Sequence, residues 1–195
     1  MSQGTLEEVL VLASASPRRH EILQAAGIEH LVRPSTVPED RRSGEDPLAY
    51  VKRLAEEKAR AVDRGRGEII LGADTTVCLE IGSEVLVLGK PADEQDAARM
   101  LRLLSGRRHV VHTGICLISK RDAIVDAAST YVQFVPLADE EVWEYTRSGE
   151  PADKAGAYAI QGLASKFVSS IDGCYHNVVG LPVSLVYRRL KDLAP

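Results

Sequence analysis

An apolar segment runs directly into a helix start in Leu10-Val-Leu-Ala-Ser14-Ala-Ser16-Pro17-Arg18-Arg19-His20. The apolar residues predict a buried strand over 9–13, and Ser16 before Pro17 predicts a helix N-terminus. Arg18 and Arg19 then fall in the first turn, where the helix dipole disfavours positive charge. Two arginines at this position are explained if their side chains and the free backbone N–H groups bind an anion such as a phosphate chain. The alternative is a solvated arginine pair, whose repulsion costs only roughly a few tenths of a kcal/mol.

The rest of the chain intersperses helices with strands. Hydrophobic spacing, caps and glycines predict helices from Pro17 to Gly27, from Asp46-Pro47 through Val62, from Asp93 to Gly106, from Asp139 through Trp143, and from Pro182. Further strands are predicted over 68–79, 109–118, 124–135, 157–161 and 165–171, with a hairpin turn at 81–84 and a polar loop over 33–46. Because the middle is rich in antiparallel hairpins, we predict a mixed α/β (α+β) fold instead of a regular doubly wound one.

Bulk composition narrows the function classes. The 195 residues, 45% hydrophobic and 27% charged, suffice for one sizeable core. A net charge of −4 argues against nonspecific binding to a nucleic-acid polymer, so a basic site must be local and suits a small anion better. Cys78, Cys116 and Cys174 have no CxxC spacing and indicate buried residues in a reducing compartment. Without a signal sequence or a long apolar run, we expect a cytoplasmic protein that does not contact membranes.

Asp74 is the second candidate for chemistry. It interrupts the apolar strand Glu68-Ile-Ile-Leu-Gly-Ala-Asp74-Thr75-Thr76-Val-Cys-Leu79. Burying an unpaired carboxylate there costs several kcal/mol, so Asp74 requires a metal, a cation or strong hydrogen bonds. Asp74 is thus either a general base or magnesium ligand facing a phosphate, or a cap on backbone N–H groups at a strand end. Thr75 offers a hydroxyl to a ligand, or simply suits a strand.

Two later segments contain further candidates. Lys90 lies in Gly89-Lys90-Pro91 after an apolar strand, which is not a P-loop because the GxxxxGK[ST] spacing is absent. Small residues surround Gly156 in EPADKAGAYAIQG at 150–162 and permit close backbone approach to a ligand. Gln161 then offers an amide for a base edge. The alternatives are a surface charge for Lys90, a salt-bridged loop for Asp153-Lys154, and an ordinary strand-end side chain for Gln161.

Two groups of polar residues carry no functional signal by themselves. His109 and His112 lie three apart on a predicted strand, so they point to opposite faces and are interpreted as structural. Glu39-Asp40 lies in the polar loop and by itself is a solvated acidic pair.

Taken in order, these segments resemble the Maf family of nucleoside triphosphate pyrophosphatases. The matching segments are ASASPRR at 13–19, Glu39, RLAEEKA at 53–59, LGADTTV at 71–77, GKP at 89–91, MLRLLSGRRHVVHTGI at 100–115, EPADKAGAYAIQG at 150–162 and NVVGLP at 177–182. The resemblance implies a single domain over residues 1–195 with the fold of inosine triphosphate pyrophosphatases (Maf/Ham1). In that fold, two lobes surround a central mixed sheet and a deep cleft.

The resemblance also implies roles for individual residues. Asp74 matches the catalytic proton acceptor, and Arg18, Thr75 and Gln161 match positions that set substrate choice. The remaining matches line the cleft. They are Ser14, Arg19, Glu39, Lys58, Lys90, Asp153 and Lys154. Our own hypothesis is that Ser14, Arg19, Lys58 and Lys90 bind the phosphates. We also expect a divalent cation, Mg²⁺ or Mn²⁺, with Glu39 or Asp74 as its ligand. A homodimer is compatible with the family.

The AYAIQG version of the motif at 157–162, with a complete SPRR at 16–19, resembles the subfamily that prefers dTTP and UTP. It implies hydrolysis of these nucleotides, and of modified pyrimidine nucleotides, to the monophosphate and pyrophosphate, a house-cleaning role with a link to cell-division arrest. A competing hypothesis is a nucleotide-binding regulator of septum formation that does not turn its ligand over. Another is a promiscuous phosphatase that releases orthophosphate.

Overall fold

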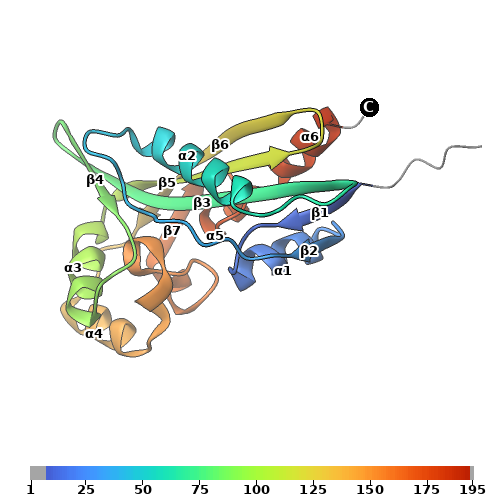
Figure 1. Cartoon of the computed structure of the whole chain (residues 1–195). Coiled ribbons are helices and arrows are strands. Elements are labelled where there is room, and N and C mark those ends of the chain that lie inside the picture. Colours follow the sequence, from blue (N-terminus) through green and yellow to red (C-terminus); the bar gives the residue numbers. More distant parts are fainter. Residues whose placement is uncertain (1–7, 194–195) are drawn as a thin grey trace, which may run out of the picture. The chain divides into compact units, whose positions relative to one another are not determined.

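The computed structural model describes residues 8–193. The helices are α1 (Pro17–Ala25), α2 (Pro47–Arg60), α3 (Glu94–Leu104), α4 (Asp139–Arg147), α5 (Tyr175–Val179) and α6 (Val183–Leu193). The strands are β1 (Val9–Leu12), β2 (His30–Val32), β3 (Glu68–Ile81), β4 (Glu84–Leu88), β5 (Arg108–Ile118), β6 (Ala123–Phe134) and β7 (Val168–Asp172) (Figure 1). Short 3₁₀ turns span Glu150–Asp153, Ala155–Ala157 and Leu163–Phe167.

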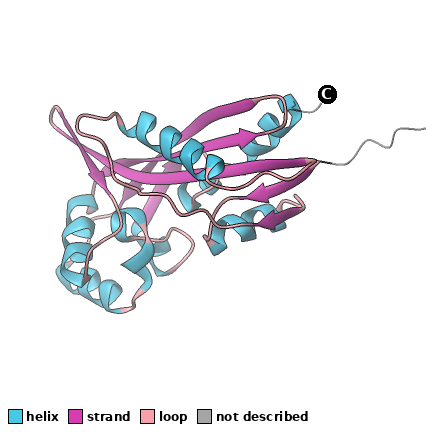
Figure 2. Ribbon diagram, in the orientation of Figure 1, coloured by secondary structure: helices cyan, strands magenta, loops and turns pink. Residues whose placement is uncertain are grey.

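The strands form a mixed sheet in the order β2-β1-β3-β5-β6-β7, with β4 paired to β3. Strand β1 is parallel to both β2 and β3, whereas the β3–β4 and β6–β7 pairs are antiparallel. Helices are interspersed with these strands along the chain (Figure 2). The predicted mixed α/β class is therefore confirmed.

The described residues divide into two compact units, in agreement with the expected two lobes. The first unit contains the described chain through Asp74, together with Gly114–Ala127 and the segment from Gly180 onward. The second contains Thr75–Thr113 and Ala128–Val179. Strands β3, β5 and β6 are each shared between the units, and β3 changes unit between Asp74 and Thr75.

In the first unit, α2 packs unusually close to the strands. A Cβ added at Gly72 of β3 would lie 2.1 Å from the carbonyl oxygen of Ala55, and one at Gly114 of β5 would lie 2.3 Å from that of Val51. Only glycine permits such an approach of helix and strand backbones. The core around this contact consists of Val11, Ala13, Ala55, Ala59, Val62, Ile70 and Cys116. The close packing places the C-terminal turn of α2, with Lys58, against β3.

The core of the second unit includes a cluster of rings. His109, Phe134 and Tyr158 contact one another edge to face, with centroids 4.9 to 5.4 Å apart. Phe167 extends the cluster from Phe134 to Tyr145 of α4. Helices α3 and α4 lie side by side in this unit (Figure 1). Edge-to-face geometry adds to the stabilisation that burial alone provides.

Local sequence signals account for most helix starts. Asp46 accepts hydrogen bonds from the amides of Leu48 and Ala49, and Asp93 accepts one from Asp96, so both predicted caps are confirmed. Ser16 occupies the N-cap position of α1, but its side chain makes no capping hydrogen bond. Pro17 alone therefore carries the signal for this helix start.

The predicted strand over 157–161 is wrong. Gly156 and Ala157 both have left-handed backbone conformations, with φ values of 69° and 58°, so the chain cannot extend there. Residues 160–162 form a turn instead, and the strand predicted over 165–171 begins only at Val168 as β7. Strand β2 and helix α5 were not predicted, because both are short.

Two further expectations concern the cysteines and membranes. Cys78 and Cys116 are buried free thiols, as predicted, and Cys174 is half-buried. Burial raises the pKa of Cys116 to about 12. Among residues 8–193, no helix has both the length and the apolar character needed to cross a membrane.

Candidate active site

The start of α1 carries a buried arginine. Arg19 is only 9% exposed, and its Nε donates a hydrogen bond to the carbonyl oxygen of Gly180 at 2.8 Å. An Nη of Arg19 donates to Oγ of Ser14 at 3.0 Å, and the amide of Ser16 donates to the same oxygen at 3.2 Å. These bonds exclude the solvated alternative for Arg19, while Arg18 is half-buried. Ser14 and Arg19 are thus held together where β1 leads into α1.

Lys58 joins two carboxylates in the same unit. Its Nζ lies 2.7 Å from Oδ1 of Asp74 and 2.6 Å from Oε1 of Glu39. Asp74 and Lys58 are buried, at 7% and 8% exposure, whereas the side chain of Glu39 is 42% exposed. Asp74 therefore has the cationic partner that its position in an apolar strand demands, and Glu39 is part of an ion-paired cluster.

Burial and charge oppose each other in this cluster. Burial raises the pKa of Asp74 above its ordinary value, and Lys58 and Arg19 oppose that shift. Burial likewise lowers the pKa of Arg19, while the carboxylate of Asp74 raises it and the charge of Arg18 lowers it. A carboxyl group with a raised pKa beside buried cations is typical of an active site that handles anions and transfers protons.

The loop that carries Glu39 is fixed by α2. The hydroxyl of Tyr50 donates to the carbonyl oxygen of Glu39 at 2.7 Å, and Arg53 donates to that of Asp40 at 3.1 Å. Arg53 also binds both carboxylate oxygens of Glu45, at 2.6 and 2.8 Å. Because Tyr50, Arg53 and Lys58 all belong to α2, this helix sets both the backbone and the carboxylate of Glu39.

In the second unit, a hydrogen-bond chain sets the orientation of Thr75. The hydroxyl of Thr113 donates to the carbonyl oxygen of Asn177 at 3.0 Å, and both residues are fully buried. Since the Thr113 proton is used there, the 2.9 Å contact between the two threonine Oγ atoms requires Thr75 to donate to Thr113. Asn177 is fixed in turn by hydrogen bonds from its amide to Val111 and Thr130. Thr75 is therefore the donor and Thr113 the acceptor in this contact.

The other predicted residues of this unit lie near the 3₁₀ turns. Lys154 donates to the carboxylate of Asp153 and, at 3.2 Å, to the carbonyl oxygen of Glu150. Lys90 is exposed and follows Gly89, whose carbonyl oxygen accepts a hydrogen bond from the amide of Gly156 at 3.0 Å. Gln161 is exposed in the turn at 160–162. The Gly89–Gly156 bond thus connects the segment of Lys90 to that of Lys154.

Comparison with known proteins identifies the family. The family model described as Maf-like protein matches residues 9–193. The chain belongs to the Maf family. Two relatives named dTTP/UTP pyrophosphatase are similar to this Maf chain, from Koribacter versatilis and Thermococcus onnurineus. The first is 50% identical over 93% of this chain and 93% of its own length, and the second is 48% identical over 95% and 97%.

A solved structure, that of a HAM1 protein from Coxiella burnetii, is also similar to the Maf chain. It has a TM-score of 0.48 and 15% identity, covering 94% of this chain and 98% of that one.

The predicted site residues of the Maf chain fall into two groups. The first unit holds Ser14, Arg18, Arg19, Glu39, Lys58 and Asp74, and the second holds Thr75, Lys90, Asp153, Lys154 and Gln161. Within the first unit, the ion pairs of Lys58 bring Glu39 and Asp74 together. Within the second, Asp153 and Lys154 pair with each other, as the salt-bridged alternative expected.

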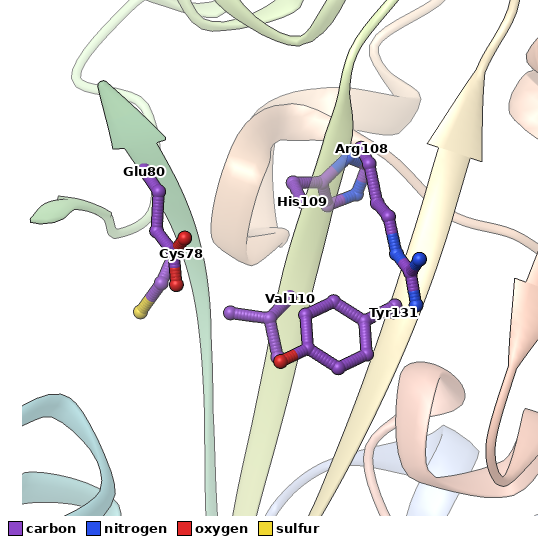
Figure 3. Close-up of a pocket in the computed structure, with 6 residues that line it drawn as sticks. All are labelled: Cys78, Glu80, Arg108, His109, Val110 and Tyr131. Carbon is purple, nitrogen blue, oxygen red and sulfur yellow. The ribbon is translucent and has the colours of Figure 1, made fainter. Parts of the chain in front are cut away.

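A cavity of about 200 Å³ in the second unit does not contain any predicted site residue. It is lined by Cys78, Glu80, Arg108, His109, Val110 and Tyr131 of β3, β5 and β6 (Figure 3). The guanidinium of Arg108 lies 4.3 Å from the ring centre of Tyr131 and pairs with Asp172 at 2.8 Å. These interactions occupy its charged group, and the cavity adds no residue to the candidate active site.

Sequence reasoning missed the residues that support the candidate active site. Tyr50 binds the backbone of Glu39 and Arg53 that of Asp40, and Arg53 lies within the RLAEEKA segment, of which only Lys58 had an expected role. Tyr145 and Glu150 form hydrogen bonds with the segment around Gln161. Burial and the hydrogen bond to Glu150 raise the pKa of Tyr145, so its hydroxyl keeps its proton. No local pattern signals these contacts, because they join residues far apart in the sequence.

Proposed function

We propose that this protein is a nucleoside triphosphate pyrophosphatase that hydrolyses dTTP and UTP to the monophosphate and pyrophosphate. The observation that supports this most is the buried carboxylate of Asp74, paired with Lys58 in the unit that also holds Arg19. An anion-binding regulator gains little from a buried carboxylate, whereas a hydrolase needs a base. The names of the relatives support the same assignment.

The phosphates are bound by cations and backbone amides. Arg18 and Arg19 lie in the first turn of α1, where free N–H groups and the helix dipole favour an anion. Ser14 orients Arg19, and Lys58 and Lys90 neutralise further phosphate charge. Charge neutralisation of this kind stabilises the transition state of phosphoryl transfer.

Asp74 acts as the general base. Its carboxylate accepts a proton from a water molecule whose oxygen attacks the α-phosphorus in line, and the bond from that phosphorus to the bridging oxygen breaks. Pyrophosphate leaves with the electron pair of that bond. Burial raises the pKa of Asp74, which makes it a stronger base than an exposed aspartate.

A divalent cation, Mg²⁺ or Mn²⁺, is the expected cofactor. Among residues 8–193, no group of three or more His, Cys, Asp and Glu side chains is arranged to hold a metal ion. Glu39 and Asp74, which share the Lys58 ammonium, nonetheless fit Mg²⁺, which usually takes one or two carboxylates together with substrate phosphates. Bound there, the ion would neutralise charge on the phosphate oxygens.

Base selection is assigned to Thr75 and Gln161, with Arg18. Thymine and uracil carry a hydrogen on N3, and cytosine does not. Thr75 presents an acceptor because its own proton is directed to Thr113, so it suits the N3–H of thymine and uracil. A site built to hydrogen-bond one edge rejects a base that leaves its polar groups unpaired.

The test is product analysis with a panel of substrates. The purified protein is incubated with Mg²⁺ and each of dTTP, UTP, CTP, ATP and GTP, and pyrophosphate and orthophosphate are assayed separately. We expect pyrophosphate from dTTP and UTP, little from the other nucleotides, and no release in excess EDTA. Orthophosphate as the first product indicates the promiscuous phosphatase. Tight nucleotide binding without release of either product indicates the regulator of septum formation.

The proposal also covers the cellular location, the physiological role and the assembly of the enzyme. We place the enzyme in the cytoplasm, in a house-cleaning role that removes normal or modified pyrimidine nucleotides, with no nucleic-acid polymer as partner. The single domain over residues 1–195 and the homodimer remain predictions. The molar mass in solution tests the homodimer, and a single cooperative unfolding transition tests the domain.

A further inference from the structure

The segment around Gln161 has a conformation that its own sequence does not favour. Ala157 has a φ of 58°, in the left-handed region that non-glycine residues rarely adopt, and it is fully buried. Residues 150–167 form short 3₁₀ turns separated by irregular chain instead of a regular element. A strained and irregular segment of this kind persists only where its surroundings determine it.

Two side chains bind the backbone of this segment on either side of Gln161. The hydroxyl of Tyr145 accepts a hydrogen bond from the amide of Ala159 at 3.1 Å and donates one to Oε1 of Glu150 at 2.8 Å. The other carboxylate oxygen of Glu150 accepts from the amide of Leu163 at 3.0 Å. Ala159 and Leu163 lie two residues before and two residues after Gln161. Tyr145 and Glu150 therefore bracket Gln161 by hydrogen bonds to its backbone on both sides.

The packing leaves this arrangement little freedom. Tyr145 is only 2% exposed, and its ring contacts Phe167 edge to face with centroids 5.4 Å apart. A Cβ added at Gly162 would lie 2.1 Å from Oε2 of Glu150, so the carboxylate lies directly against the backbone next to Gln161. The carbonyl oxygen of Glu150 also accepts the ammonium of Lys154 at 3.2 Å. Displacement of the Glu150 carboxylate would thus release the turn that carries Gln161.

We propose that Tyr145 and Glu150 are positioning residues that set the base selectivity of this enzyme by fixing the turn of Gln161. The inference rests on the proposed function, because it assigns base recognition to Gln161. A binding group displaced by about 1 Å can cost up to about a hundredfold in rate. Loosening the turn should therefore weaken the preference for uracil over cytosine.

The test compares UTP with CTP in two variants. Tyr145→Phe removes both hydrogen bonds of the hydroxyl with little change in shape, and Glu150→Gln replaces one acceptor oxygen by an amide that cannot accept. We expect the ratio of kcat/KM for UTP to that for CTP to fall about tenfold in each, within the range that misplacement produces. Tyr187→Phe is the matched control, because Tyr187 is 52% exposed on α6 and should leave the ratio unchanged.

The ratio of kcat/KM for UTP to that for CTP distinguishes a positioning role from an effect on protein stability alone. A variant that is only less stable loses active enzyme equally for both substrates, so its ratio stays at the wild-type value, and that result overturns the proposal. Gly162→Ala supplies a second route to the same displacement, because its Cβ pushes on the Glu150 carboxylate. A lowered ratio in this variant supports the proposal, and an unchanged ratio counts against it.

A binding measurement separates this proposal from the proposed function. Calorimetry with non-hydrolysable analogues of UTP and CTP gives the selectivity of binding without turnover. If the wild type releases no pyrophosphate, the proposed function fails, yet a fall in binding selectivity in Tyr145→Phe still supports the positioning role. If the wild type binds both analogues equally, or if Tyr145→Phe retains the wild-type selectivity, the positioning role is overturned.

Discussion

The ammonium of Lys58 lies 2.7 Å from Oδ1 of Asp74, and both side chains are buried. The pair exists because α2 packs against β3 at Gly72, two residues before Asp74. The cation compensates the burial of the carboxylate, which keeps Asp74 available as an ionised base.

Replacement of Asp74 by asparagine tests the role of the base. Asp74→Asn keeps the size of the side chain but cannot accept a proton, so pyrophosphate release from dTTP should fall by about a hundredfold or more. The measurement is kcat under saturating dTTP and Mg²⁺, with nucleotide affinity and Tm as controls for folding. Near-normal kcat in a folded Asp74→Asn protein would leave Asp74 with a structural role only.

A double-mutant cycle measures the Lys58–Asp74 pair. Lys58→Met leaves a buried carboxylate without its main cation, and we expect a loss of about 3 kcal/mol in the free energy of unfolding at pH 7. Combining it with Asp74→Asn removes that charge, so the double variant should lose less than the sum of the single variants. Urea unfolding of the four proteins provides the values. Simple additivity would show that the two side chains are not energetically coupled.

The Thr113 hydroxyl is predicted to influence base choice without contacting the nucleotide. Thr113→Val removes the acceptor of the Thr75 proton, so the Thr75 hydroxyl can turn its proton toward N3 of cytosine. The UTP-to-CTP ratio of kcat/KM should fall about fivefold, the equivalent of one net hydrogen bond of about 1 kcal/mol. Thr113→Ser keeps the hydroxyl and should keep the ratio. A Thr113→Val enzyme with wild-type selectivity would refute the proposed orientation of Thr75.

The buried His109 makes stability dependent on pH. Burial lowers the pKa of His109 to about 4, while its unfolded value is about 6.5. Above pH 6.5 the imidazole is neutral in both the folded and the unfolded state, so the titration of His109 does not reduce the free energy of unfolding. Between pH 6.5 and 4 the unfolded chain binds the additional proton, so stability falls on acidification by up to about 1.4 kcal/mol per pH unit.

The comparison that isolates this effect uses His109→Gln. An amide retains a hydrogen-bonding group toward Tyr158, whose hydroxyl lies 2.9 Å from Nε2 of His109, but it does not titrate. The free energy of unfolding of the variant should therefore fall less between pH 6.5 and 4. If the free energy of unfolding depends on pH in the same way in both proteins, His109 is not the cause of the loss of stability on acidification.

Gly72 is predicted to be essential for the packing of α2. Gly72→Ala places a Cβ 2.1 Å from the carbonyl oxygen of Ala55, so helix and strand must separate, at about 3 kcal/mol of stability. Gly89→Ala is the matched control, since its added Cβ has no heavy atom within 4 Å. Thermal unfolding of both variants is the measurement, and equal Tm values would contradict the prediction.

Much of the fold could be predicted from local signals. Pro17, the Asp46 cap and the alternation of apolar runs located α1, α2 and β3, because propensity and burial agree there. The strand predicted over 157–161 failed because the positive φ values of Gly156 and Ala157 override an apolar pattern. A left-handed alanine has no sequence signature, and the bond from the amide of Gly156 to the carbonyl oxygen of Gly89, beside Ala157, joins segments far apart in the sequence.

The candidate site was predictable in its residue types but not in its pairings. A carboxylate within an apolar strand demands a cation, yet only the close packing at Gly72 shows that Lys58 supplies it. The role of Tyr145 depends on a contact with Ala159, fourteen residues away, and on Glu150 as an intermediary. Such contacts follow from tertiary structure, which sequence periodicity does not encode.

Strand β3 passes from one unit to the other between Asp74 and Thr75. In the proposed scheme the proton acceptor is therefore the last residue of its segment of the first unit, and Thr75, which contributes to base recognition, is the first residue of the second. The turn of Gln161 is bound by Tyr145 and Glu150 within the second unit, whereas the packing of α2 on Gly72 and the Lys58–Asp74 pair belong to the first. Because adjacent residues of β3 have these different roles, base recognition could change in evolution while the hydrolytic residues stay the same. Enzyme engineering could follow the same route toward new nucleobases.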